Sequence, residues 1–227
     1  MEACRERMAD GPTRGEAGYF VNMRARAVID GGDWEGAGGA IAADLDAFAD
    51  LGLPYDFVDA LAALRTGDAE VAARLRSRYG KPEDERDPRR GILLLELDGL
   101  IALADGDSEP GIALLQEAAA REETLPYEFG PPATLMPPHE LLAAELAALD
   151  RHAEARAAWE EQLARTPKRT QSLLGLAGTA MALGDEVAAR EAYAVLAEVW
   201  GGADAGVAVP ARSGKSGNFI PWPSYAR

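Results

Sequence analysis

The stretch 137–200 constrains this chain most, because its pattern of small and large apolar residues recurs after 34 positions. The matched pairs are Leu142 and Leu176, Ala143 and Ala177, Leu146 and Ala180, Ala155 and Ala189, and Trp159 and Tyr193. Each unit has a turn residue between its two apolar segments, Asp150 in the first and Gly184 in the second. Periods of this length are typical of arrays in which each unit packs only on its neighbours. The spacing therefore predicts two consecutive helical hairpins.

The same spacing, carried back along the chain, locates three earlier hairpins. The five turn residues are Gly32, Gly67, Gly106, Asp150 and Gly184, which lie 35, 39, 44 and 34 positions apart. The two longer intervals contain a charged connection, 80–90, and a proline-rich connection, 126–138. Insertions in a repeat array fall between the helices and not within them. We therefore predict about five helical hairpins over residues 15–200.

Apolar residues three and four positions apart, together with breakers, predict the individual helices. Upstream of 137 they cover 16–30, 34–49, 55–64, 69–79, 91–105 and 109–122, with a break at Leu51-Gly52-Leu53-Pro54. Asp33 is expected to cap the helix from Trp34, and Gly99 to lie where two helices approach closely. Alanine-rich composition with 7% aromatic residues agrees with close helix crossings, so the predicted fold class is all-α.

The two ends of the chain differ from the array. Residues 1–14 are polar and contain breakers, so we predict a frayed leader. Residues 201–227 are rich in Gly, Ala, Ser and Pro, and they predict an irregular tail. The aromatic residues of the tail, Phe219, Trp222 and Tyr225, would pack on the last repeat, stay mobile or dock on another chain.

Charge and cysteine content restrict the class of partner and the compartment. A net charge of −15 repels polyanions, so nucleic acid is not an expected partner. No apolar run approaches the roughly 20 residues of a membrane span, and residues 1–11 lack the pattern of a signal peptide. Cys4 is the only cysteine, which excludes an intrachain disulfide. We therefore expect a cytoplasmic protein with no membrane or nucleic-acid partner.

Three segments carry a resemblance to the tetratricopeptide repeat (TPR) family over residues 16–200. They are Met23-Arg24-Ala25-Arg26 before Gly32-Asp33-Trp34, Pro137-Pro138-His139-Glu140-Leu141-Leu142 before Ala153-Glu154-Ala155-Arg156-Ala157-Ala158-Trp159, and Arg165-Thr166-Pro167-Lys168-Arg169 before Leu173-Leu174-Gly175-Leu176-Ala177. More narrowly, the chain resembles the C-terminal half of longer bacterial TPR proteins of unassigned activity. The resemblance implies a right-handed α-solenoid that serves as a scaffold for a protein or peptide.

In the geometry of that family, the first helix of each hairpin lines a concave groove. The residues at groove positions would be Tyr19, Asn22, Arg26, Phe57, Leu61, Leu93, Glu96, Leu100, Glu140, Gln171, Leu174 and Met181. Arg26, Glu96 and Glu140 would form a polar anchor in a partly apolar groove. The competing interpretation is a solvated concave face whose charges serve only solubility.

No complete catalytic or metal-binding motif is present. His139-Glu140 would need a second histidine at position 143, which is Ala143. Ser213-Gly214-Lys215-Ser216 resembles the end of a phosphate loop, but the required earlier glycine is replaced by Val209. The chain has only two histidines and one cysteine, so few residues are available to form a catalytic pair of nucleophile and base. We therefore predict no catalytic residues, no metal site and no cofactor.

These observations lead to three hypotheses of different classes. The leading one is a non-catalytic scaffold that binds a peptide or partner protein in its groove. The second is a small-molecule-binding protein or enzyme, which would use Glu96, Glu140 and Arg26, with His139 as a proton carrier under the 126–138 loop. The third is self-assembly through the exposed end repeats or the aromatic tail.

Overall fold

The computed structural model describes residues 8, 11–32, 34–37, 45, 47–126 and 134–201, and all regular structure in these ranges is helical. These residues form two compact units, one ending at Met136 and the other beginning at Pro137. The fold class is therefore all-α, as predicted. Within the described ranges, no helix combines the length and the hydrophobicity needed to cross a bilayer.

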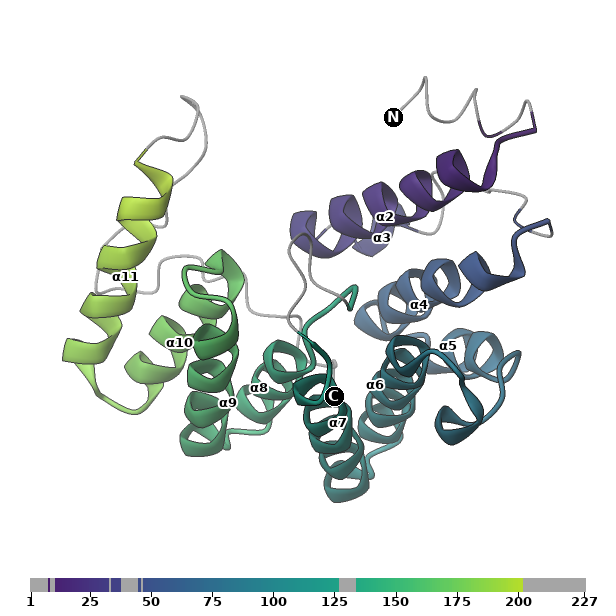
Figure 1. The fold of residues 1–227 in the computed structure, drawn as a ribbon. Coiled ribbons are helices and arrows are strands. Elements are labelled where there is room, and N and C mark those ends of the chain that lie inside the picture. The colour runs from purple at the N-terminus through teal and green to yellow at the C-terminus, as the bar shows by residue number, and fades with distance from the viewer. Residues whose placement is uncertain are drawn as a thin grey trace. The chain divides into compact units, whose positions relative to one another are not determined.

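Unit 1 contains a series of paired helices and one short 3-10 turn (Figure 1). Its elements are α2 (Arg14–Gly31), α3 (Trp34–Ala37), α4 (Ala49–Arg65), α5 (Ala69–Arg76), η1 (Pro82–Asp84), α6 (Pro88–Ala104) and α7 (Ser108–Glu123). Helix α4 packs on both α2 and α6, so each hairpin contacts its neighbour in the sequence. Helix α2 has a complete capping box, in which Thr13 and Glu16 satisfy each other's backbone N–H groups.

Unit 2 contains the two hairpins that the 34-residue repeat predicts. They are α8 (Pro138–Ala148) with α9 (His152–Arg165), and α10 (Thr170–Ala182) with α11 (Glu186–Trp200). Helix α9 also packs against α10, which joins the two hairpins into one body. The N-terminus of α11 is capped by Asp185, whose carboxylate accepts a hydrogen bond from the Ala188 N–H at 3.0 Å.

All five predicted turn residues adopt the left-handed backbone conformation. Their φ angles are 66° at Gly32, 86° at Gly67, 92° at Gly106, 59° at Asp150 and 74° at Gly184. A left-handed residue reverses the chain directly after a helix, and glycine takes this conformation without a steric penalty. The predicted turn positions are therefore confirmed, including the one occupied by aspartate.

Glycines allow close helix contacts in both units. A Cβ atom on Gly99 would lie 3.0 Å from the Gly111 carbonyl oxygen, and one on Gly111 would lie 2.8 Å from that of Gly99. These glycines allow α6 and α7 to approach at backbone distance, which confirms the expectation for Gly99. In unit 2, Gly175 leaves room for the indole of Trp159, which is 1% exposed.

The expected break at residues 51–54 is wrong, because these residues lie inside α4. Pro54 lacks the N–H that would bond to the carbonyl four residues earlier, at Asp50. The guanidinium of Arg90 donates to that Asp50 carbonyl instead, at 2.9 Å. Leu51 and Leu53 are buried, so packing also favours the helical conformation here. A contact 40 positions away in the sequence thus replaces the missing helical bond.

Other sequence-based boundaries shift or lie outside the described residues. The helix expected over 69–79 ends at Arg76, whose guanidinium donates to the carbonyls of Tyr79 and Gly80 at 3.2 and 3.0 Å. Of the helix expected over 34–49, the structure describes α3 and then residues 45 and 47–49, the last of which begins α4. Asp33, most of the leader, residues 127–133 and the tail from 202 lie outside the described residues.

Candidate functional site

The eight main groove candidates divide between the two units. Unit 1 holds Tyr19, Asn22, Arg26, Phe57 and Glu96, and unit 2 holds Glu140, Gln171 and Met181. Tyr19 and Met181 are 67% and 46% exposed, Asn22 is exposed, and Arg26 and Gln171 are half-buried. Phe57, Glu96 and Glu140 are fully buried, so they do not form part of an exposed surface. The structure therefore places three candidates in unit 1 on accessible positions, all of them on α2.

These three side chains, Tyr19, Asn22 and Arg26, follow one another at spacings of three and four residues and define the α2 face. The Asn22 amide donates to the Gly18 carbonyl at 2.9 Å, one turn earlier on the same helix. The Arg26 guanidinium donates to the Leu135 carbonyl, which joins α2 to the chain segment just before the end of unit 1. The α2 face therefore presents one aromatic side chain followed by two polar side chains.

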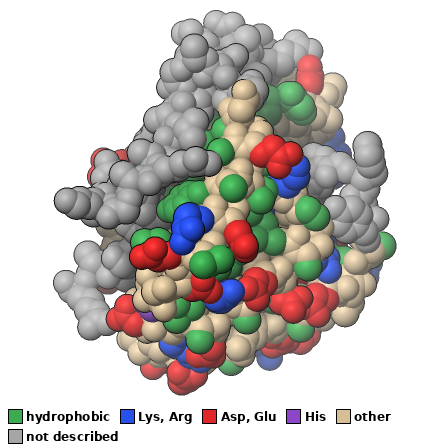
Figure 2. Space-filling model, turned by 90° about the vertical axis from the view of Figure 1, so that its left-hand side faces the viewer, with side chains coloured by type: hydrophobic (Ala, Val, Ile, Leu, Met, Phe, Trp, Pro, Cys, Tyr) green, Lys and Arg blue, Asp and Glu red, His purple; other side chains and the backbone are tan. Residues whose placement is uncertain are grey.

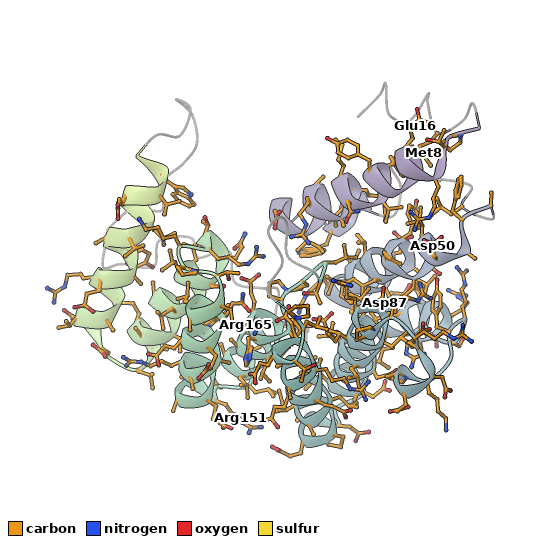
Figure 3. All side chains as sticks on the ribbon, viewed as in Figure 1. Met8, Glu16, Asp50, Asp87, Arg151 and Arg165 are labelled. Atoms are coloured by element: carbon orange, nitrogen blue, oxygen red, sulfur yellow. The ribbon has the colours of Figure 1, made fainter. Side chains whose placement is uncertain are left out.

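Helix α2 is held in place by a buried arginine on its other side. Arg24 is 4% exposed, forms an ion pair with Asp59 of α4 and lies 4.2 Å above the centroid of the Tyr55 ring. The pKa of Asp59 is raised above its usual value, because the effect of burial exceeds the opposite effect of Arg24. At the other end of the helix, Arg14 forms an ion pair with Asp50, where the start of α4 lies close to the first turn of α2 (Figure 3).

The buried carboxylate of Glu140 has a complete set of partners within unit 2. Arg169 donates to both of its oxygens, through Nε and Nη2, at 2.7 Å each. Ser172 Oγ donates a third hydrogen bond at 2.5 Å. Bidentate pairing with arginine is among the strongest side-chain interactions. Glu140 therefore connects the start of α8 to the start of α10, a structural role that its repeat position did not indicate.

The buried carboxyl of Glu96 is in the opposite situation. It lies on α6, it is 0% exposed, and neither of its oxygens has a hydrogen-bond partner among the described residues. Burial raises the pKa of Glu96 well above its usual value, and the negative charge of Glu122 on α7 raises it further. Glu122 Oε1 accepts a hydrogen bond from Thr134 Oγ1 at 2.8 Å. We call Glu96 and Glu122 the acid pair.

The pKa shift of Glu96 makes the stability of the chain depend on pH. A glutamate in the unfolded chain ionises above about pH 4.3, but Glu96 in the folded chain stays neutral to higher pH. Stability is therefore lost as pH rises from about 4.3 to the folded-state pKa. We expect Glu96→Gln to gain about 1.4 kcal/mol relative to wild type for each pH unit in that window. Urea denaturation at pH 4 to 8 measures this difference, and a difference that does not change with pH would contradict the assignment.

The candidate acid–base groups among the described residues are buried. Pairs of carboxyl groups with separated pKa values can divide acid and base roles, but each must touch the substrate. Glu96 is fully buried, and His139, at the second position of α8, is 8% exposed. Among the described residues, no group of three or more His, Cys, Asp or Glu side chains could hold a metal ion. The α2 face is therefore the candidate functional surface of unit 1.

Comparison of the chain with protein-family models, with curated proteins and with solved structures finds no match. The architecture and the site thus define an all-helical protein with paired helices and an exposed aromatic and polar face.

Several residues of these sites were not found from the sequence. Glu122 and Thr134 come from segments that no motif marks, and the repeat segment around Arg169 does not indicate that Arg169 and Ser172 bind Glu140. One signal was present for Glu96, because it is the single charged residue in the apolar run Ile92–Leu97. A lone acid in such a run predicts burial on all sides of a helix, which the structure shows for residues 91–97.

Proposed function

We propose that this chain is a right-handed TPR-like scaffold that binds a peptide or partner protein through the α2 face. The observation that carries the proposal is Tyr19, which is 67% exposed on a helix held by the Arg24–Asp59 and Arg14–Asp50 ion pairs. Tyrosine is enriched among the residues that dominate binding energy in protein interfaces. A fixed backbone lowers the entropy cost of ordering such a surface on binding.

The repeat geometry supports the scaffold part of the proposal. Paired helices joined by a left-handed residue recur through both units, and consecutive hairpins pack on each other within each unit. Such arrays present extended surfaces for partners. With a net charge of −15 the partner is a protein or peptide, and not a nucleic acid. A single cysteine suits a reducing compartment, so we place this activity in the cytoplasm, and the resemblance to bacterial TPR proteins suggests a bacterial one.

The described part of the face shown in Figure 2 is mixed in character. On the face shown in Figure 2, acidic and basic side chains alternate with hydrophobic ones. Among the described residues, the exposed large hydrophobic side chains outside α2 are Met181, Leu183, Val187 and Val199, all in unit 2. The alternative function, an enzyme or small-molecule binder using Glu96 and Glu140, receives no support from their full burial.

The test begins with peptides selected against the whole chain from a displayed random library. For each selected peptide, we expect Tyr19→Ala to weaken the Kd at least about tenfold, as for a residue central to an interface. Val187→Ala is the matched control, because Val187 is also an exposed apolar residue, at 59%, but lies in unit 2. Calorimetry measures the affinities.

The outcomes separate the two parts of the proposal. Selected peptides that bind Tyr19→Ala as tightly as wild type would exclude the α2 face. A library that yields no peptide above background would exclude the peptide-binding scaffold.

A further inference from the structure

One hydrogen bond links the acid pair to the last segment of unit 1, and a second joins that segment to α2. Thr134 donates to Glu122, and the next residue, Leu135, accepts from Arg26 through its carbonyl. Thr134, Leu135 and Met136 are 2%, 8% and 0% exposed. We call residues 134–136 the docked segment. Its side chains are buried although it has no helical backbone of its own.

We propose that the acid pair is a proton-operated latch, which keeps the docked segment in place while Glu96 is neutral and releases it when Glu96 ionises. The inference does not depend on partner binding, because the latch lies within unit 1 and acts in the chain alone. The geometry that carries it is the combination of a fully buried carboxyl without a hydrogen-bond partner and a neighbouring carboxyl that anchors the segment.

The physical reason is the cost of a buried negative charge. An ionised Glu96 would have no hydrogen bond and would repel the Glu122 carboxylate in surroundings of low dielectric constant. The charge becomes stable when water reaches the carboxylate. Helices α6 and α7 cannot separate easily, because they are in backbone contact at Gly99 and Gly111. The docked segment has no helical backbone of its own, so its release disrupts less regular structure than separation of the two helices would.

Among the described residues, no basic side chain acts on the pKa of Glu96. The elements that pack on α6 are α4, α5, η1 and α7. Of their basic residues, Arg76 of α5 pairs with Asp98 and Arg121 of α7 pairs with Glu117. Arg65 of α4 is buried, but burial and Glu122 are the only causes that act on the pKa of Glu96.

The other acidic side chains of these elements are exposed or paired with other groups, and Asp50, Glu70 and Glu109 are among the exposed ones. Asp56 of α4 accepts from Arg78 and Tyr79, Asp59 pairs with Arg24, and Glu83 and Asp84 of η1 are exposed. Glu123 of α7 is exposed as well. Glu122 is thus the charged group that couples Glu96 to the docked segment.

The test follows Met136, whose fully buried side chain reports whether the segment is docked. A neutral paramagnetic solute broadens the NMR signal of a methionine methyl group only when solvent reaches it. We expect the Met136 methyl of wild type to be protected at low pH and to become accessible as pH rises through the ionisation of Glu96. In Glu96→Gln, which cannot ionise, the methyl is expected to stay protected at every pH.

A second variant is expected to shift the pH at which the docked segment is released. Glu122→Gln removes the neighbouring negative charge, so Glu96 ionises more readily and the release moves to lower pH. Glu123→Gln, an exposed neighbour of Glu122 on the same helix, is the control and should leave the midpoint unchanged. Three results would overturn the proposal: a Met136 methyl protected in wild type throughout, the same release in Glu96→Gln, or a midpoint that Glu122→Gln leaves unmoved.

Discussion

Replacement of Arg169 by methionine is expected to lower the free energy of unfolding of unit 2 by about 3 to 5 kcal/mol. The change removes both guanidinium bonds to Glu140, whose side chain is 0% exposed. The carboxylate would keep only the bond from Ser172 and would remain buried with its charge uncompensated. Urea denaturation followed by the fluorescence of the buried Trp159 measures the loss.

Two further variants show whether the loss comes from the unpaired charge. Glu140→Gln combined with Arg169→Met removes both charges, and it should recover a substantial part of the lost stability. Lys168→Met, next to Arg169, breaks an exposed ion pair with Glu198, and should cost less than about 1 kcal/mol. If Arg169→Met costs no more than Lys168→Met, the Glu140 network does not stabilise the unit.

Gly175→Ala is expected to destabilise unit 2 by about 3 kcal/mol, at the upper end of the usual cost of overpacking. An added Cβ would lie 2.2 Å from Cζ2 of Trp159 and 2.4 Å from its Cε2. The indole cannot rotate away freely, because its Nε1 donates to Thr179 Oγ1 at 3.1 Å and the ring is buried. Thermal and urea denaturation of the variant measure the effect.

A smaller ring opposite the new methyl group should relieve the strain. We expect Gly175→Ala in a Trp159→Phe background to cost less than in wild type, as measured by a double-mutant cycle. Gly15→Ala is the control, because a Cβ at this position of α2 meets no atom within 4 Å, so the substitution should not destabilise the chain. Equal costs in the two backgrounds would mean that Trp159 does not set the size of residue 175.

The turns and most helices depend on local sequence patterns, and the structure confirms their predicted positions. Each turn residue of the array is left-handed, and glycine or aspartate at that point is a local requirement that a sequence displays directly. The exception in α4 has a distant cause. Its first turns continue through Pro54 because Arg90, from the other end of the η1 connection, supplies a donor to the Asp50 carbonyl. No local pattern contains that contact.

The candidate site was less predictable, because repeat positions do not report burial. Tyr19 and Glu96 were both assigned to the groove side of first helices, yet one is 67% exposed and the other fully buried. Glu96 and Glu140 look alike in sequence, each a single acid among apolar residues. The two carboxyl groups differ because a basic residue from another helix connection, Arg169, pairs with Glu140.

By itself, the sequence determined the all-helical class, the repeat period and the positions at which the chain reverses. These properties depend on side-chain periodicity and on the backbone freedom of single residues, and both act over one or two helical turns. Only the tertiary structure decided which carboxyl groups are paired, which face of α2 is exposed and how residues 134–136 are held. Those outcomes depend on desolvation and on hydrogen bonds between residues distant in the sequence, such as Arg26 with Leu135 and Glu140 with Arg169.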